Sequence, residues 1–293
     1  MAAVHRTLIG SIIGFLAISL ASCSSNGGDT TPTATSSSSV ETTTTTDQPI
    51  LQSGDKYVSL GSSLASGFGI AVQSESCGRS SRNLGQLIAA EFELALTDVS
   101  CGAAVIPNIL DTAQGQAQPQ IEFVGADTKL ITVVIGGNDI GFNGTALVCG
   151  DPNSVCTAPP ALAENEAALE GKLVTMLNAL KAKAPDAVVV LVTYPREFPI
   201  ENCPALSLTD EELSMLRDMG DALQNSLVAA AQQTGVLLVD PYSVDADHTA
   251  CAPESERWTS GYTVATGEGF AYHPTALGHQ AMASLVIDAL NAL

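Results

Sequence analysis

The sequence predicts an α/β fold, a three-layer α/β/α sandwich in which helices cover both faces of a central parallel sheet. Apolar runs rich in β-branched residues recur along the later part of the 293-residue chain, and such runs are typical of strands buried on both faces. Longer segments with apolar residues at helical spacing separate these runs. This alternation favours a parallel sheet, because parallel neighbours need a crossover connection that is usually a helix.

Four strands follow from the strongest apolar runs, and a fifth, over residues 96–100, follows from a weaker one. The four are residues 56–60, 130–135, 187–193 and 236–239. Helices are predicted over residues 82–93, 161–184, 209–233 and 275–293. Pro185 after the second helix and Gly235 after the third are typical stop signals. Thr-Asp-Glu-Glu at 209–212 indicates a capped start of the third helix.

The first fifty residues differ in composition from the rest. His5 and Arg6 precede a mainly apolar run over 8–20, the pattern of a secretory signal. The run ends in Leu-Ala-Ser-Cys, which resembles the lipobox of bacterial lipoproteins and implies a signal peptide at 1–22 and lipidation of Cys23. An ordinary signal peptide that contains a cysteine is the alternative. Fifteen of residues 24–49 are Ser or Thr, so we expect residues 23–50 to be a disordered linker and residues 51–293 the folded domain.

The formal net charge of −20 at pH 7 argues against nucleic acid as a partner. Binding to phosphates needs concentrated Lys and Arg, and the chain has only 11 of these residues against 31 Asp and Glu. The charge indicates a solvated acidic surface.

Six of the seven cysteines remain once Cys23 is set aside. An even number behind a secretory signal favours disulfides over a metal site. The sequence has no Cys-x-x-Cys pair and no histidines at zinc-finger spacing from cysteines, so no metal is expected. Six cysteines allow many pairings, and the sequence alone does not choose among them. The simplest pairing is sequential: Cys77–Cys101, Cys149–Cys156 and Cys203–Cys251.

Turns of small residues follow three of the predicted strands. They are Gly-Ser-Ser at 61–63, Ser-Cys-Gly-Ala-Ala at 100–104 and Gly-Gly-Asn-Asp at 136–139, and Tyr-His-Pro at 272–274 precedes the last helix. Ligand sites of parallel sheets lie beyond the carboxyl ends of the strands, where these turns meet. A hydroxyl, a base and N–H donors for an oxyanion are the groups that acyl transfer needs.

With these blocks the chain resembles the SGNH hydrolases, also called GDSL esterases and lipases, and most closely their secreted actinobacterial branch. The family's G-D-S-x-x-x-G block corresponds to residues 61–67, its oxyanion-glycine block to 99–105, its G-x-N-D block to 136–139 and its D-x-x-H-P block to 270–274. The resemblance spans residues 55–293. It implies a flavodoxin-like sandwich without a separate lid domain, and six cysteines paired sequentially. The G-x-S-x-G elbow of ordinary α/β-hydrolases is absent.

The resemblance also implies roles for individual residues. Ser63 corresponds to the nucleophile, and His273 to the general base that takes the serine proton and returns it to the leaving alcohol. The backbone N–H groups of Ser63 and Ala103 and the side-chain amide of Asn138 correspond to the oxyanion donors.

Three positions depart from the family pattern. Ser62 stands where the family has Asp, and Ala103 stands where it has the oxyanion glycine, so a methyl group demands room or a different φ. Phe270 replaces the aspartate of the catalytic triad. Some members of the secreted branch lack this aspartate and orient the histidine through a backbone carbonyl. We therefore expect a Ser63–His273 dyad with the Phe270 carbonyl as orienter.

The expected function is extracytoplasmic hydrolysis of carboxylic esters, by an esterase or lipase, through an acyl-serine intermediate. Acylglycerols, phospholipids and short-chain esters are the substrates that the resemblance implies, without a metal or cofactor. We expect a monomer that is lipid-anchored to a bacterial membrane or secreted. Two alternatives stay open: a glycan O-acetylesterase, and a catalytically impaired binding lipoprotein, which the three departures favour.

Overall fold

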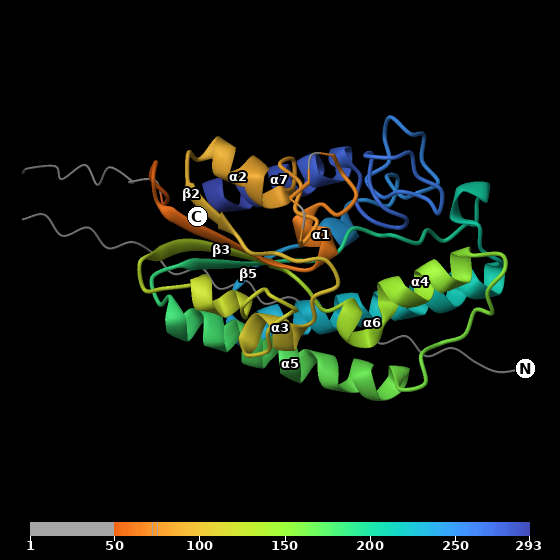
Figure 1. Cartoon of the computed structure of the whole chain (residues 1–293), viewed down its shortest axis with the longest axis horizontal. Helices are drawn as coiled ribbons and strands as arrows, with labels where there is room; N and C mark the ends of the chain where they lie inside the picture. The colour runs from red at the N-terminus through yellow and green to blue at the C-terminus, as the bar shows by residue number, and fades with distance from the viewer. Residues whose placement is uncertain (1–49, 72, 75) are drawn as a thin grey trace, which may run out of the picture. The chain divides into compact units, whose positions relative to one another are not determined.

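The computed structural model describes residues 50–71, 73, 74 and 76–293 (Figure 1). The predicted signal peptide, the lipidation site Cys23 and the linker up to residue 49 lie outside the described residues. Within the described part, no helix combines the length and the apolar character that crossing a membrane requires.

A five-stranded parallel sheet forms the centre of the domain. Its strands lie in the order β2-β1-β3-β4-β5. They are β1 (Lys56–Gly61), β2 (Ala95–Asp98), β3 (Thr128–Val134), β4 (Val188–Val192) and β5 (Leu237–Val239). This order is that of flavodoxin-like sheets, and every neighbouring pair is parallel. The predicted α/β sandwich is confirmed, and each predicted strand overlaps an observed one.

Helices cover the two faces of the sheet (Figure 1). Helices α2 (Leu84–Glu91) and α7 (Ala276–Asn291) pack together on one face, and α5 (Leu162–Lys183) and α6 (Asp210–Thr234) pack together on the other. All four were expected from the sequence. Helix α6 begins with the predicted capping box, in which Thr209 and Glu212 exchange side-chain bonds with each other's backbone N–H. It ends at Gly235, whose φ is 66°.

Three short helices were not expected: α1 (Ser63–Ser66), α3 (Ile106–Leu110) and α4 (Phe142–Gly150). Four 3-10 turns accompany them: η1 (Gln120–Phe123), η2 (Asn138–Ile140), η3 (Pro204–Leu206) and η4 (Pro241–Ser243). Helix α4 lies in a segment whose apolar residues do not mark one face, because the buried face includes Asn143 and Thr145 whereas Val148 on the other side is exposed. Tertiary burial holds it in place, and single-sequence patterns do not report tertiary burial.

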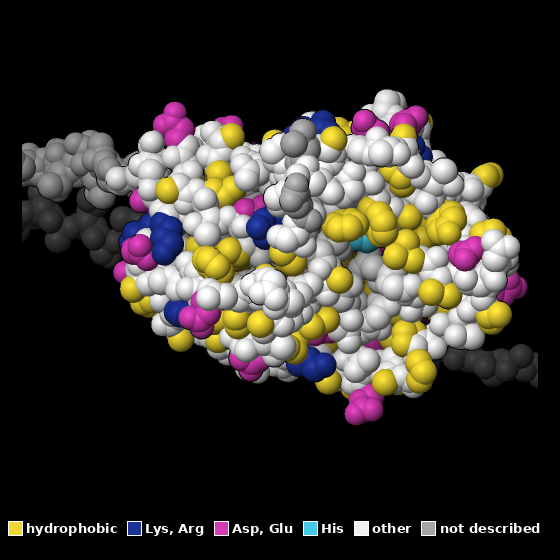
Figure 2. All heavy atoms as spheres, in the orientation of Figure 1, with side chains coloured by type: hydrophobic (Ala, Val, Ile, Leu, Met, Phe, Trp, Pro, Cys, Tyr) yellow, Lys and Arg dark blue, Asp and Glu magenta, His cyan; other side chains and the backbone are white. Residues whose placement is uncertain are grey.

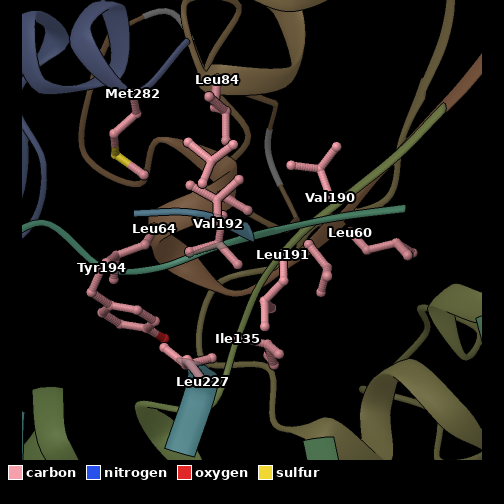
Figure 3. Close-up of a cluster of buried hydrophobic side chains, with 14 of the residues drawn as sticks. Leu60, Leu64, Leu84, Ile135, Val190, Leu191, Val192, Tyr194, Leu227 and Met282 are labelled. Carbon is pink, nitrogen blue, oxygen red and sulfur yellow. The ribbon is translucent and has the colours of Figure 1, made fainter. Parts of the chain in front are cut away.

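Apolar side chains from the sheet and from both helical layers form the core. Figure 3 shows Leu60, Val190 and Val192 from strands together with Leu84 and Met282 from helices, and all five are fully buried. Burial of each such side chain contributes about 1.5–3 kcal/mol relative to leaving it exposed. The strands are therefore rigid supports for the segments that follow them.

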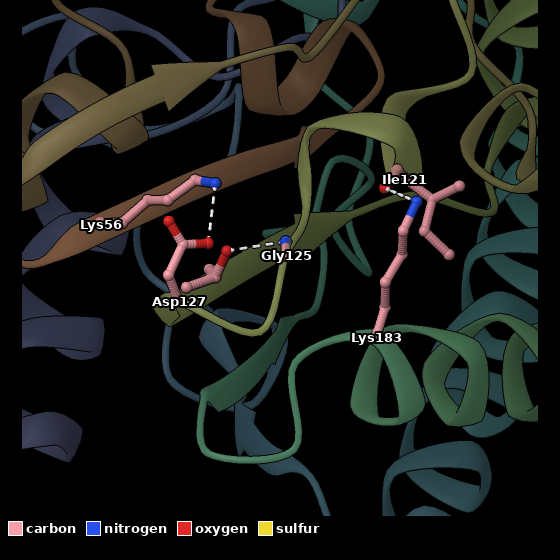
Figure 4. Close-up of polar contacts among 6 residues, drawn as sticks. Lys56, Ile121, Gly125, Asp127 and Lys183 are labelled. Carbon is pink, nitrogen blue, oxygen red and sulfur yellow. Dashed lines mark hydrogen bonds and ion pairs between the residues drawn. The ribbon is translucent and has the colours of Figure 1, made fainter.

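Polar contacts join the segments near the amino ends of the strands (Figure 4). Lys56 at the start of β1 forms an ion pair with Asp127 at 3.1 Å, and Lys183 at the end of α5 donates to the Ile121 carbonyl at 2.9 Å. Asp127 is well exposed, so solvent screens this pair and it adds little to the stability of the fold.

The three disulfides pair sequentially, as expected: Cys77–Cys101, Cys149–Cys156 and Cys203–Cys251. Every bridge joins segments that lie beyond the carboxyl ends of strands. Each is expected to stabilise the fold by about 2–4 kcal/mol in the loop-entropy description. Their placement restrains the loops at one edge of the sheet.

The last residue of β1 accepts only glycine. Gly61 has a φ of 136°, and a Cβ there would lie 2.2 Å from the Val134 carbonyl oxygen. We expect Gly61→Ala to lower the free energy of unfolding by about 3 kcal/mol or more, since backbone strain alone costs about 1–3 kcal/mol. Denaturant unfolding measures this change.

Gly171→Ala provides the matched control. Gly171 lies on the exposed side of α5 with open space around the added methyl group. This variant should be more stable than the wild type by about 0.5–1 kcal/mol, because alanine is the better helix former. An unchanged unfolding midpoint for Gly61→Ala would contradict the described packing at the end of β1.

Candidate active site

Ser63 is the first residue of α1 and follows β1 after one intervening residue. The chain is held on both sides of the turn. The Ser62 N–H donates to the Val134 carbonyl at 3.0 Å. The buried Gln120 side chain bonds both backbone groups of Gly61, at 2.8 and 3.0 Å. The position of Ser63 is therefore fixed by the carboxyl ends of two adjacent strands.

His273 contacts Ser63 directly. Its Nε2 lies 2.8 Å from the Ser63 Oγ, and both residues are buried, with exposed fractions of 4% and 6%. Its Nδ1 lies 2.8 Å from the carbonyl oxygen of Ala271. Because a carbonyl oxygen only accepts, Nδ1 carries the hydrogen, and the lone pair of Nε2 faces the serine hydroxyl. This is the tautomer that a general base requires.

The expected orienter was wrong by one residue. The Phe270 carbonyl accepts the backbone N–H of His273 at 3.1 Å and not the imidazole Nδ1–H. Phe270 and His273 are the ends of a tight turn, so the Phe270 carbonyl is used to close it, and the carbonyl of Ala271 is the one that reaches the ring. The Phe270 ring instead packs edge-on against the imidazole, with ring centres 5.1 Å apart.

Burial sets the protonation state of His273. It lowers the pKa of the imidazole to about 4, and the bond to the Ala271 carbonyl opposes this with a smaller upward effect. The imidazole is therefore neutral at pH 7. Among the described residues, no carboxylate hydrogen-bonds to it.

The expected oxyanion donors lie beside the serine. Asn138 donates one side-chain N–H to the Ala104 carbonyl at 3.0 Å. An amide nitrogen has two hydrogens, and no described residue accepts the second one, which can therefore bind an oxyanion. Ala103 has a φ of 62°, in the left-handed region where alanine is strained. Ala103 therefore adopts this conformation at a cost in backbone strain, and its backbone N–H is still present as a donor.

These residues line one pocket of about 350 Å³, together with apolar side chains. Ser63, His273, Asn138 and Ala103 form its polar part. The apolar part includes Phe68, Leu147, Phe270 and the Cys77 end of a disulfide. Figure 2 shows hydrophobic side chains bordering a hollow in which a histidine surface is visible. A largely apolar pocket with a few convergent polar groups is typical of a small-molecule site.

The supporting roles of three residues were not predicted by the sequence analysis, although Asp139 lies in the block at 136–139. One is Gln120, described above. The second, Asp139, accepts the Ile106 N–H with both carboxylate oxygens, at 3.1 and 3.2 Å, and burial raises the pKa of Asp139 to about 6. The third, Tyr194, accepts the Gly137 N–H at 3.0 Å. Their partners are 33 or more residues away in sequence, and no local pattern signals such contacts.

The two other histidines among the described residues have structural positions. His279 is buried on α7, where its Nδ1 accepts the Leu84 N–H at 3.1 Å and joins this helix to α2. His248 stacks on Trp258 with ring centres 4.5 Å apart. Neither lines the pocket. No group of three or more His, Cys, Asp or Glu side chains within the described residues is placed to hold a metal ion.

A serine hydroxyl in contact with a neutral imidazole, beside free N–H donors at the carboxyl edge of a parallel sheet, is the arrangement of a serine hydrolase. Comparison with known proteins gives the family. The sequence profile of the GDSL-like lipase/acylhydrolase family matches residues 59–281. The chain is 31% identical over 257 residues to Lipase 2 of Streptomyces coelicolor, a match that covers 80% of this chain and 85% of the relative.

Solved structures agree with this assignment. The extracellular lipase of Streptomyces rimosus is similar with a TM-score of 0.67 and 26% identity, covering 80% of this chain and 100% of that one. Phospholipase A1 of Streptomyces albidoflavus gives a TM-score of 0.66 and 27% identity, covering 82% and 99%. The chain belongs to the GDSL-like lipase/acylhydrolase family and is a carboxylic ester hydrolase of that family.

The depressed pKa of His273 predicts an acid limb in the pH profile near pH 4. Only a neutral imidazole can accept the serine proton, so with His273 as the expected base kcat/KM for an activated ester should stay level down to about pH 5 and fall below it. An imidazole with its ordinary pKa of about 6.5 would already be mostly protonated at pH 5.5. A midpoint near pH 6.5 would contradict the buried environment of His273.

A stability control accompanies this profile. Because the folded-state pKa is below the ordinary value, the unfolded chain binds this proton first, and the stability contributed by neutral His273 is lost between about pH 6.5 and pH 4. Near-ultraviolet circular dichroism at each pH separates loss of fold from protonation of the base.

Proposed function

We propose that the protein hydrolyses carboxylic esters through an acyl-Ser63 intermediate, with His273 as the general base and acid. The contact between Ser63 Oγ and His273 Nε2 at 2.8 Å is the observation that carries the proposal. The bond from Nδ1 to the Ala271 carbonyl supports it, since it selects the basic tautomer. The pair acts as a dyad in which a backbone carbonyl takes the place of the triad aspartate.

The reaction proceeds in two displacements. Ser63 Oγ attacks the ester carbonyl carbon while its proton moves to Nε2 of His273. The tetrahedral oxyanion is bound by the N–H groups of Ser63 and Ala103 and by the free N–H of Asn138, each donor lowering the barrier by about 3–4 kcal/mol. The carbon–oxygen bond to the alcohol then breaks, and His273 returns the proton to the leaving oxygen. Water repeats these steps on the acyl-serine and releases the acid.

An apolar acyl chain is the substrate part that suits the pocket best. Phe68, Leu147 and Phe270 line it, and each methylene group buried there contributes about 0.8 kcal/mol. The similar proteins named lipase and phospholipase A1 support an acylglycerol or phospholipid ester as the substrate. A glycan O-acetylesterase would need polar groups to bind a sugar, and the lining of this pocket gives it less support.

We also propose an extracytoplasmic location. Six cysteines paired in three disulfides support it, because disulfides persist in oxidising compartments. The lipobox-like sequence that ends at Cys23 supports the attachment of a lipid anchor to that residue. The linker up to residue 50 would then separate the hydrolase domain from the membrane surface.

An acyl-chain series of activated esters tests the function. We expect turnover by the wild type and a loss of at least about 10⁴-fold in kcat for Ser63→Ala and for His273→Ala. Ser62→Ala is the matched control, since Ser62 is buried and does not line the pocket. It should keep kcat within about threefold, because the substitution removes a hydroxyl that has no hydrogen-bond partner among the described residues and leaves the backbone unchanged.

Each alternative has its own signature in this series. Activity that is highest on long or medium acyl chains supports the lipid-ester assignment. Activity confined to acetate would favour the O-acetylesterase. No turnover by the folded wild type would refute the catalytic assignment and favour a binding lipoprotein. Full activity of Ser63→Ala would refute Ser63 as the nucleophile.

A further inference from the structure

The segment before His273 is a turn with one unusual residue. The His273 N–H donates to the Phe270 carbonyl at 3.1 Å and closes a four-residue turn. Within it, Tyr272 has a φ of 57°, whereas Ala271 is not in the left-handed region. This is the type II pattern, in which the third position normally belongs to glycine or asparagine. A tyrosine there is strained, so another interaction must hold it.

The left-handed residue decides where the Ala271 carbonyl points. In a type II turn the peptide between the second and third residues is flipped relative to a type I turn. The flipped peptide here is the one between Ala271 and Tyr272. Its carbonyl is the group that accepts the Nδ1–H of His273 at 2.8 Å. A turn with a negative φ at Tyr272 would aim this carbonyl away from the imidazole.

Several contacts hold Tyr272 in this conformation. Its side chain is 1% exposed, and its hydroxyl donates to the Leu206 carbonyl at 2.5 Å. Its ring packs against Phe198 and Tyr262, with ring centres 5.3 and 5.9 Å away. Leu206 ends η3, which begins one residue after Cys203, and a disulfide joins Cys203 to Cys251. The hydroxyl is thus bonded to a segment that is itself covalently restrained.

We propose that Tyr272 is a positioning residue for His273. By holding the left-handed turn, it aims the Ala271 carbonyl at Nδ1, and this carbonyl then orients the imidazole as the aspartate does in a catalytic triad. The inference deepens the proposed function, because it assumes that His273 is the base. It differs from a packing role, in which Tyr272 would merely fill space beneath the site.

Two substitutions at Tyr272 separate these roles. Tyr272→Gly removes the whole side chain but accepts a positive φ without strain, whereas Tyr272→Ala keeps a methyl group that disfavours it. If the turn is what matters, the glycine variant should retain at least about fivefold more kcat than the alanine variant. If Tyr272 only fills space, the alanine variant should be equal or better, because it leaves the smaller cavity.

Tyr272→Phe removes only the hydroxyl. Unlike the glycine and alanine variants, it keeps the ring and leaves no large cavity in the core. We expect it to lower kcat about tenfold with KM within twofold, since the base is misaligned while the substrate pocket is unchanged. Tyr262→Phe is the matched control. It removes the hydroxyl of the neighbouring ring. This hydroxyl forms no hydrogen bond with the described residues, so the variant should leave kcat unchanged.

A spectroscopic readout makes the test independent of turnover. The hydrogen on Nδ1 of His273 should give a downfield proton resonance in protein with ¹⁵N-labelled histidine, assigned by its loss in His273→Gln. The signal should persist in Tyr262→Phe and weaken in Tyr272→Phe and Tyr272→Ala. Thermal unfolding confirms that each variant is folded.

The outcomes of the two proposals are distinguishable. An intact signal and wild-type kcat in folded Tyr272→Phe, or an alanine variant equal to the glycine variant in both readouts, would overturn the positioning role. Absence of ester hydrolysis by the wild type would refute the proposed function, while the resonance would still report whether Tyr272 orients the imidazole.

Discussion

The hydrogen bond from Nδ1 of His273 to the Ala271 carbonyl determines which imidazole nitrogen faces Ser63, and the proposed chemistry depends on it. A carbonyl dipole fixes the tautomer as well as a carboxylate does, but it stabilises the imidazolium less because it carries no net charge. Burial therefore prevails, and the pKa of His273 falls to about 4. The proposed base is weaker than in a triad but is neutral over a wide pH range.

The rest of the domain makes this arrangement rigid. Buried parallel strands fix the segments after β1 and β3, and disulfides restrain the loops that carry Ala103 and Leu206. Within the described part of the chain, four non-glycine residues have a positive φ, and two of them, Ala103 and Tyr272, line or adjoin the site. Local strain persists only where surrounding packing and bonds over-determine it, and it is often concentrated at functional sites. Its occurrence beside both Ser63 and His273 fits a site that is preorganised.

Periodicity and turn chemistry were enough to predict the sheet and its main helices, because buried strands and capped helices impose local patterns. The three turns of small residues and the Tyr-His-Pro segment predicted that Ser63, Ala103, Asn138 and His273 come together, and all four line one pocket. The orienting carbonyl was misassigned to Phe270, because the choice between adjacent carbonyls depends on one peptide flip. Helix α4 and the supporting contacts of Gln120 and Tyr194 were missed, because they arise from tertiary burial between distant segments.

Covalent labelling tests most directly the central claim that Ser63 is activated by His273 without a carboxylate. The protein would be treated with a p-nitrophenyl alkylphosphonate, which traps nucleophilic serines, and the modified peptide identified by mass spectrometry. The account predicts one adduct, on Ser63, formed at a rate that falls at least about 10³-fold in His273→Ala. An adduct on Ser62 or Ser66, or no adduct on the folded protein, would contradict it.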